Sequence, residues 1–181
     1  MGEKLSLHKN KKVVIMFTDE AGFGRISTPA HCWAPPKERP CSPYQIVRQY
    51  RNAYGAVCPT TGESLFEVHQ KNNGDTFQVF LKSLSKKFPD YYIILCCDNA
   101  SWHKNKILKI PRNIKLFFLP PRTPEMNPIE QIWKEIRKRG FKNVMFDTID
   151  AVINKFWDVV ENMEKSVIIS ITLREWIKEL F

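Results

Sequence analysis

Three short runs of consecutive apolar residues divide the chain, and polar or turn-forming residues follow each of them. The runs are Val13–Phe17, Tyr91–Cys97 and Ile114–Leu119. Uninterrupted apolar runs of this length predict strands that are buried on both faces, as in the middle of a sheet. The first run leads into Asp19 and the second into Asp98. We therefore expect both acids to lie where a buried strand ends.

Apolar residues at helical spacing predict several helices around these strands. The first helix follows Asp75, a residue type that often caps helices, and ends before Pro89. Two amphipathic helices are expected near the C-terminus, and the last one opens with a capping-box pair, Thr172 and Glu175. Another helix follows the third apolar run, and its buried face holds Ile129, Ile132, Trp133 and Ile136.

The region between the first two apolar runs is typical of a hairpin. Residues 25–33 and 52–58 are compatible with strands, and the turn-forming sequence at 59–63 leads into another strand at 64–69. Residues 35–40 carry three prolines and are expected to form an exposed loop. Strands and hairpins that precede alternating strands and helices predict an α/β domain, with a mixed central sheet flanked by helices.

Length and composition fit a single domain. The chain has 181 residues, 43% of them hydrophobic, which is enough for one compact core. We expect residues 1–12 to form a basic leader and residues 13–145 to form the core. Residues 146–181 are expected to supply helices that pack on this core within the same domain.

Charge and cysteine content narrow the class of protein. Lys and Arg number 28 against 19 acidic residues, so the net charge of +9 favours a polyanionic partner such as nucleic acid, although some metabolic enzymes are equally basic. Five irregularly spaced cysteines, without CxxC or HxxxH pairs, argue against a secreted disulfide framework and against zinc. No window reaches the roughly 18 apolar residues of a membrane span, and no signal-peptide pattern is present. We expect a cytoplasmic protein that does not enter a membrane.

Asp19 and Asp98 are the first candidates for chemistry. If their strands are parallel neighbours, both side chains emerge at carboxyl ends, where open α/β sheets form ligand sites. Two carboxylates this close repel each other unless a cation lies between them, and hard oxygen ligands select Mg²⁺ or Mn²⁺. The alternative is that each aspartate merely ends a strand and begins a turn, as Asp often does.

Glu130 is the third candidate. The proline-rich loop at 120–128 places it in the first turn of a helix, where it can act as a third metal ligand. The alternative is a capping box, with Asn127 as the N-cap, Pro128 as the first helical residue and Glu130 completing the motif. Asn127, together with Asn99 and His103, is a candidate for a supporting role beside the acids.

Basic residues continue along the helix that carries Glu130. Residues 112–142 hold eight basic and three acidic residues, and Lys134 and Arg137 follow Glu130 at helical spacing. A phosphate backbone on this stripe would pass the carboxylate, although an ordinary solvated helix face is the alternative. The residues predicted to contact DNA are Arg122, Lys134, Arg137, Lys138 and Arg139. Lone His103 can orient a phosphate or a water, or be an ordinary polar residue.

Three sequence strings together resemble a known family. They are FTDEAGF (17–23), CCDNASWHK (96–104) and LPPRTPEMNPIEQIWKEIRKR (119–139). In this order they are similar to the Asp-Asp-Glu (DDE) transposases of the mariner-like superfamily, in its prokaryotic insertion-sequence branch. The resemblance spans about residues 13–139. It implies a ribonuclease H-like fold in which Asp19, Asp98 and Glu130 are the catalytic residues and the metal ligands.

The resemblance also implies a reaction and partners. The three acids would hold two divalent ions, Mg²⁺ or Mn²⁺, when DNA is bound. One ion would activate water or a DNA 3′-hydroxyl, and the other would stabilise the leaving oxygen during in-line displacement at phosphorus. Such an enzyme cuts double-stranded DNA at the ends of its element and joins the freed 3′-hydroxyl to target DNA, typically at TA. A homodimer is expected, because two ends must be joined.

The chain departs from this family pattern in three ways. Arg122-Thr123 stands where relatives commonly carry an aromatic residue and Ser, and the spacing between Asp98 and Glu130 is slightly short. The helix-turn-helix region that usually precedes the first catalytic strand is expected to be absent, because only twelve residues precede Val13. Two alternatives stay open: another ribonuclease H-like nuclease, such as a junction resolvase, or a catalytically inactive, domesticated DNA-binding module.

Overall fold

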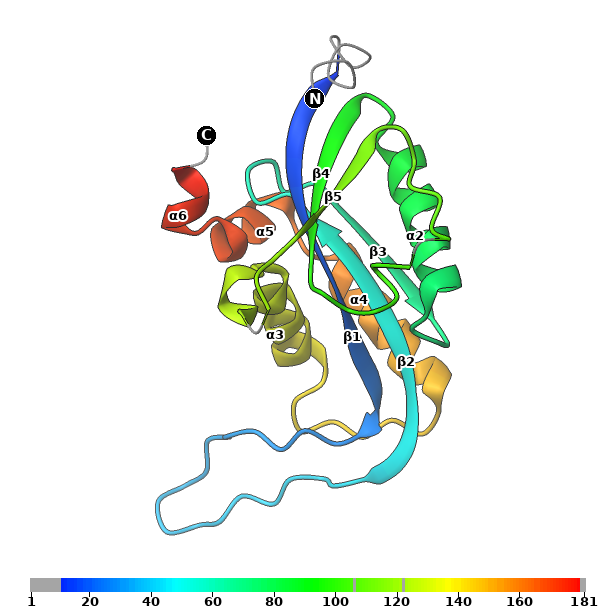
Figure 1. Cartoon of the computed structure of the whole chain (residues 1–181). Coiled ribbons are helices and arrows are strands. Elements are labelled where there is room, and N and C mark those ends of the chain that lie inside the picture. The colour runs from blue at the N-terminus through cyan, green and yellow to red at the C-terminus, as the bar shows by residue number, and fades with distance from the viewer. Residues whose placement is uncertain (1–10, 106, 122, 180–181) are drawn as a thin grey trace.

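The centre of the molecule is a five-stranded mixed sheet (Figure 1). The computed structural model describes residues 11–105, 107–121 and 123–179. The strand order is β3-β2-β1-β4-β5. Strands β1, β2 and β3 pair antiparallel, whereas β4 lies parallel to both β1 and β5. The bounds are Lys12–Ile26 for β1, Ile46–Val57 for β2, Ser64–His69 for β3, Tyr91–Cys97 for β4 and Ile114–Phe118 for β5.

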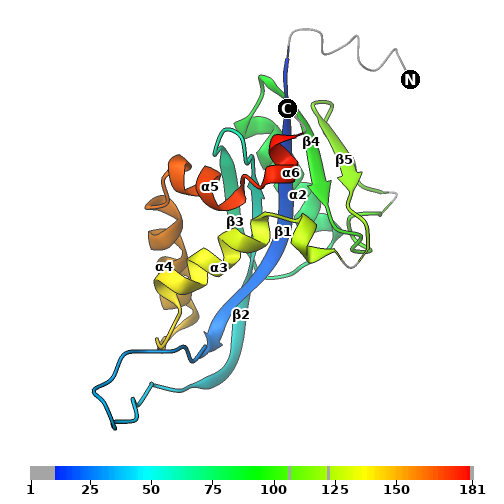
Figure 2. The ribbon, with the colours of Figure 1, turned by 90° about the vertical axis from the view of Figure 1, so that its left-hand side faces the viewer.

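Helices cover both faces of this sheet (Figure 2). Val14 and Met16 of β1 belong to the core beneath α2, whereas Ala21 and Phe23 belong to the core beneath α3 and α4. The division follows from the alternation of side chains along a strand. No helix in the described stretches has the length and apolar character that crossing a bilayer requires. The helices are α2 (Gly74–Lys87), the 3-10 turn η1 (Pro124–Met126), α3 (Ile129–Gly140), α4 (Ile149–Glu161), α5 (Lys165–Thr172) and α6 (Glu175–Lys178).

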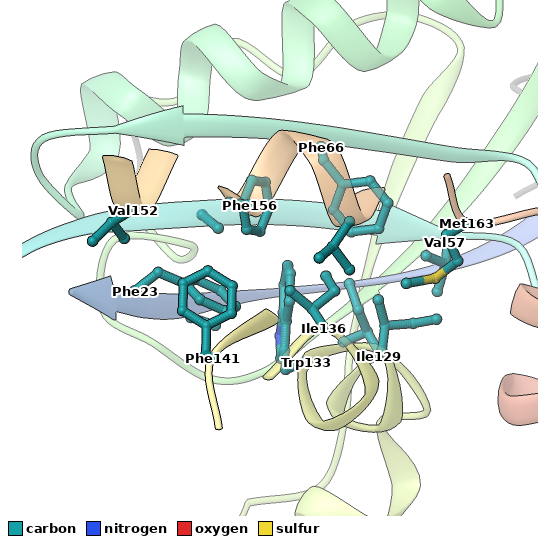
Figure 3. Close-up of a cluster of buried hydrophobic side chains, with 14 of the residues drawn as sticks. Phe23, Val57, Phe66, Ile129, Trp133, Ile136, Phe141, Val152, Phe156 and Met163 are labelled. Atoms are coloured by element: carbon teal, nitrogen blue, oxygen red, sulfur yellow. The ribbon is translucent and has the colours of Figure 1, made fainter. Parts of the chain in front are cut away.

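Trp133 of α3 is central to the larger core (Figure 3). Its side chain is fully buried, and its ring meets Phe23 and Phe66 edge-on, with centroid distances of 6.1 and 5.8 Å. Gly55 of β2 lies beneath this ring, because a Cβ atom at Gly55 would come within 2.6 Å of Trp133 Cη2. Burial of each large apolar side chain contributes about 1.5–3 kcal/mol. These contacts fix α3 firmly against the sheet.

Strand β1 is much longer than the predicted strand at Val13–Phe17. It runs to Ile26, so Asp19 lies inside the strand, and the expectation that the strand ends there was wrong. The cause is the neighbouring strand β2, whose pairing includes Asp19 with Gly55 and Gly24 with Tyr50. The polar and small residues after Phe17 are kept extended by this tertiary pairing, which their own propensities do not predict.

Several local predictions are corrected by the structure. Asn73, not Asp75, caps α2, because its side chain accepts a hydrogen bond from the backbone N–H of Thr76 at 2.9 Å. Helix α5 was not predicted. Thr172 belongs to its last turn, where its hydroxyl donates to the carbonyl of Ile168, so the predicted capping box of Thr172 and Glu175 does not form.

Other local predictions are confirmed. Strand β4 has the predicted bounds, and the turn at 59–63 does connect β2 to β3. Gly62 in this turn has a φ of 69°, a conformation that glycine adopts without steric cost. Its N–H donates to the carbonyl of Cys58 at 2.9 Å and closes the turn.

Candidate active site

Asp19 is placed opposite Asp98 by the parallel pairing of β1 and β4. The last paired residues are Phe17 and Cys96, and continuing this register by two residues brings Asp19 level with Asp98. The Oδ2 atom of Asp19 accepts a hydrogen bond from Nε1 of Trp133 at 3.2 Å. An acid inside β1 and an acid directly after β4, far apart in the sequence, are therefore brought to the same level of the sheet by the strand register.

The environment of Asp19 disfavours its charged form. The pKa of Asp19 is raised from its ordinary value of 3.8 to about 7, and burial is the largest cause. The negative charges of Glu20 and Glu130 contribute to this rise, whereas hydrogen bonds from the Glu20 backbone and from Trp133 oppose it. Such crowding of carboxyl groups is relieved when a cation binds between them.

Asp98 follows β4 directly and begins a turn. Its side chain is 55% exposed, and its Oδ1 atom accepts a hydrogen bond from the backbone N–H of Ala100 at 3.0 Å. Asn99, the next residue, donates from its side chain to the carbonyl of Leu119 and thereby ties this turn to the residue that follows β5. The turn that was the alternative to a metal site is thus present. It places the Asp98 carboxylate at the carboxyl end of β4, where the cleft lies.

Glu130 lies in the first turn of α3, and Asn127 anchors the segment before it. The amide of Asn127 donates to the carbonyl of Thr18 at 3.1 Å, and this bond is buried. The N-cap residue of α3 is Pro128, and the side chain of Asn127 makes no cap hydrogen bond, so the capping box that was the alternative for Glu130 is absent. Anchoring to Thr18 fixes the start of α3 beside Asp19.

The three predicted acids line one open cleft. The cleft has a volume of about 430 Å³. Its other walls come from the turn after β4 and from the proline-rich segment before α3; they are Asn99, Ala100, Leu119, Pro120, Pro121, Thr123 and Asn127. Within the described part of the chain, no three Asp, Glu, His or Cys side chains are already arranged to hold one ion. The three acids therefore line the same cleft, but their side chains are not yet in the arrangement of a complete metal site.

The carboxylates of the cleft nevertheless fit a hard divalent cation. Their oxygens are the ligand type that Mg²⁺ and Mn²⁺ prefer. The Oδ1 atom of Asn127 is a further oxygen of the cleft wall, and it is buried without a hydrogen-bond partner among the described residues. A buried acceptor without a donor is unfavourable, so this amide oxygen is a polar group that a donor beside the cleft would stabilise.

His103 lies behind the cleft and does not line it. Its side chain has no exposed surface, which excludes direct contact with a phosphate in this arrangement. Burial alone would lower the pKa of His103, but the hydrogen bond to Glu20 and the charges of Glu20 and Asp98 raise it above its ordinary value. The geometry therefore does not support the prediction that His103 orients a phosphate or a water.

The predicted basic stripe divides into exposed and packed residues. Lys134, Lys138 and Arg139 are exposed, and Arg139 pairs with Glu135 at 2.8 Å. Arg137 is partly buried, because its guanidinium lies 5.0 Å from the ring centroid of Phe23 and donates to the carbonyl of Gly22. Arg122 lies outside the described residues.

Sequence reasoning missed two residues of this site, Glu20 and Trp133. Glu20 directly follows Asp19, and only the adjacency of two acids hinted at a role. Trp133 was assigned to the buried face of its helix, which is correct, but its indole N–H also serves Asp19. A separate, larger hollow of about 490 Å³ lies beside Phe23, Arg25, Tyr50 and Arg137, and none of the three acids lines it.

The fold and the acidic cleft agree with the family that sequence comparison identifies. The chain belongs to the DDE superfamily of endonucleases, whose sequence model matches residues 14–153. This confirms the family predicted from the three sequence strings. The uncharacterized protein y4pE/y4sA of Sinorhizobium fredii (strain NBRC 101917 / NGR234) is 35% identical over 127 residues, which cover 68% of this chain and 93% of that protein.

Solved transposase structures share the fold. The pre-cleavage Mos1 transpososome superposes with a TM-score of 0.71 at 13% identity, over 91% of this chain and 53% of that chain. The Mos1 transposase paired-end complex with the left transposon end gives a TM-score of 0.69 at 15% identity, over 91% and 52%. This chain spans about half the length of those transposase chains. The likeness confirms the predicted ribonuclease H-like fold.

Proposed function

We propose that this chain is the catalytic domain of a DNA transposase, which cleaves DNA and transfers the cut strand by in-line displacement at phosphorus. Asp19, Asp98 and Glu130 are its catalytic residues and hold Mg²⁺ or Mn²⁺. One observation carries this proposal: acids from β1, from the turn after β4 and from the first turn of α3 line a single cleft in a DDE-superfamily chain.

The chain's own residues prepare this cleft in distinct ways. Asp19 is held by Trp133 inside a strand, Asp98 is held by a turn, and Asn127 anchors the start of the helix that carries Glu130. When bound, divalent ions supply a stronger oxygen nucleophile and charge stabilisation for the leaving oxygen. The raised pKa of Asp19 favours the same assignment, because a cation relieves the repulsion that raises it.

Double-stranded DNA is the proposed substrate. Lys134 and Arg137 continue the helix stripe that begins at Glu130, so a phosphate backbone on this stripe reaches the cleft. Solved relatives of the fold are complexes with transposon ends, and others contain Mn or Mg, which supports DNA and divalent ions for this chain. A TA target, a homodimer and action in the cytoplasm of a prokaryotic cell follow from the family resemblance and belong to the same proposal.

Cleavage assays with two matched variants test the proposal. The chain is incubated with plasmid DNA and with DNA that carries the ends of its element, in Mg²⁺ or Mn²⁺. We expect nicking and strand transfer that fall to background in Asp98→Asn and persist in Asp90→Asn, a control in an exposed turn. Metal-dependent activity that survives in Asp98→Asn overturns the assignment. Cutting of branched DNA alone, without strand transfer, identifies a resolvase instead.

A further inference from the structure

His103 lies between two carboxylates behind the proposed active site. Its Nε2 atom is 2.9 Å from Oε1 of Glu20, and its Nδ1 atom is 2.8 Å from Oδ1 of Asp98. The side chain of His103 is fully buried, that of Glu20 is 6% exposed and that of Asp98 is 55% exposed. The imidazole thus connects a carboxylate that is sealed inside the protein to one that lines the cleft.

Strand geometry explains why Glu20 reaches this position. Neighbouring residues of a strand point to opposite faces, so Glu20 points away from the face that Asp19 shares with Trp133. Glu20 pairs across the sheet with Tyr54, which belongs to the core beneath α2. Glu20 therefore lies on the face of the sheet that α2 covers, whereas Asp19 lies on the face that α3 covers and lines the acidic cleft.

The ring of His103 is held in place by its packing. Its centroid lies 4.2 Å from that of Phe77 on α2 and 5.8 Å from that of Trp102. The backbone N–H of His103 donates to the carbonyl of Ala100 at 3.0 Å, within the turn that also holds Asp98. Contacts with α2 and with its own turn therefore restrain the ring of His103 beside Asp98.

Only one oxygen of Asp98 is engaged by this arrangement. Oδ1 accepts from Ala100 and faces His103, whose contact is short but not aligned as a hydrogen bond. Oδ2 is the oxygen that the arrangement leaves for a ligand in the cleft. Asp98 follows the end of its strand, so it lacks the support that a strand and Trp133 give to Asp19.

The burial of Glu20 indicates a role beyond packing. A carboxylate that is almost fully buried costs several kcal/mol unless it is paired, and His103 is the partner that Glu20 has. Carboxylates that bind a metal are themselves held by neighbouring polar groups, and these outer partners orient the ligand. His103 contacts the Asp98 carboxylate, and Glu20 holds His103 from the other side of the ring.

We propose that Glu20 is a positioning residue that acts through His103 to hold the Asp98 carboxylate in its metal-binding orientation. This proposal rests on the function proposed above, because it assigns Asp98 to the metal. Loss of a residue that holds a metal ligand typically weakens metal binding by about 10–100-fold. The path of contacts from Glu20 to the Asp98 carboxylate runs through His103, so the two residues act on Asp98 as one unit.

A double-mutant cycle on Mn²⁺ affinity tests this proposal. Calorimetry on the full chain compares wild type, Glu20→Gln, His103→Gln and the double variant, and thermal unfolding verifies that each is folded. We expect each single variant to weaken Mn²⁺ binding by about 10–100-fold and the double variant to weaken it no further. Single-variant losses that multiply in the double variant, or Mn²⁺ affinities that match wild type, overturn the proposal.

Glu67 provides a matched control. It pairs with His69 at 2.8 Å on β3, so Glu67→Gln breaks a similar Glu–His pair outside the cleft, and we expect unchanged Mn²⁺ affinity. If Glu20→Gln does not fold, His103→Gln alone tests the proposal. A loss of Mn²⁺ affinity of about 10–100-fold in His103→Gln supports it, and an Mn²⁺ affinity equal to that of wild type overturns it. Asp98→Asn separates the two proposals. If Asp98→Asn does not weaken binding, the proposed function fails; if it does but Glu20→Gln does not, only the positioning role fails.

Discussion

Trp133 donates its indole N–H to Oδ2 of Asp19 across 3.2 Å and so connects the hydrophobic core to the acidic cleft. The ring is buried between α3 and the sheet, while the carboxylate borders the open cleft. Glu130 lies on the same helix, nearly one turn before Trp133. Packing of this one side chain therefore sets the distance between two of the three acids.

Replacing Trp133 with Phe should weaken both stability and cleavage. The Trp133→Phe variant keeps an aromatic ring but loses the hydrogen bond to Asp19 and leaves a small cavity, so we expect a loss of about 1–3 kcal/mol in the free energy of unfolding. We expect cleavage to fall about 10-fold, as when a group that orients a metal ligand is lost. Denaturant unfolding and a plasmid cleavage assay measure the two effects.

Trp157→Phe is the control for this prediction. Trp157 of α4 packs against the same core but is partly exposed. Its replacement should reduce stability without reducing cleavage in the folded protein. An equal loss of cleavage in both variants would show that the hydrogen bond to Asp19 has no specific effect.

Removing the charge of Asp19 should stabilise the metal-free protein at neutral and alkaline pH. The pKa of Asp19 is about 7 in the folded chain and 3.8 ordinarily, so the folded state binds this proton more tightly. Stability from this group is present in full below about pH 4 and is lost as pH rises through about 7. Asp19→Asn cannot ionise at this position, so it does not lose stability in this way. The Tm of Asp19→Asn minus the Tm of wild type should therefore increase from about pH 4 to pH 8.

Thermal unfolding across this pH range, without divalent ions, measures the effect. Asp90→Asn is the control, because Asp90 is exposed in a turn, and its difference from wild type should not follow the same curve. A Tm difference for Asp19→Asn that stays constant between about pH 4 and pH 8 contradicts the assigned burial effect.

A methyl group at Gly55 should displace α3. Its Cβ atom would lie 2.6 Å from Cη2 of Trp133 and 2.9 Å from Cδ1 of Ile129, both in the packed core. We expect Gly55→Ala to lower the free energy of unfolding by about 1–3 kcal/mol. Gly22→Ala is the matched control, because a Cβ atom at Gly22 meets nothing within 4 Å. Denaturant titrations that give equal losses for both variants would contradict this packing account.

The sequence predicts the sheet because its buried strands are continuous apolar runs. Tyr91–Cys97 is such a run, and the structure has β4 with these bounds. The long β1 was not predictable in this way, since residues after Phe17 are extended by pairing with β2 rather than by their own apolar pattern. Helix α5 was missed because it is short.

The three acids of the site were predictable from the sequence, but the contacts that connect them to neighbouring side chains were not. Asp19 and Asp98 were identified by their positions after apolar runs, and Glu130 by its position in the first turn of a helix. The family resemblance supported all three, and the structure places them in one cleft. The contact of His103 with Glu20 joins residues 83 positions apart in the sequence. Periodicity and local motifs do not predict which face of β1 the turn after β4 will pack against. This contact is therefore visible only in the tertiary structure.

Lys134 provides the cleanest test of DNA binding by the α3 stripe. It is exposed, and Lys134→Ala should weaken affinity for DNA of any sequence and reduce the slope of log affinity against log salt by about 1. Lys86→Ala is the control, because Lys86 is exposed on α2 at the opposite face of the sheet. Fluorescence anisotropy at several salt concentrations measures both. Equal effects of the two variants would contradict a DNA path along α3.

The central claim is that Asp19, Asp98 and Glu130 act on a divalent ion together. Crystals of the chain with bound DNA, soaked in Mn²⁺ and measured at the manganese absorption edge, test it most directly. The account predicts anomalous density in the acidic cleft, with carboxylate oxygens of Asp19, Asp98 and Glu130 at about 2.0–2.6 Å, the range for hard cations. Manganese bound elsewhere, or a cleft that holds DNA but no ion, would contradict it.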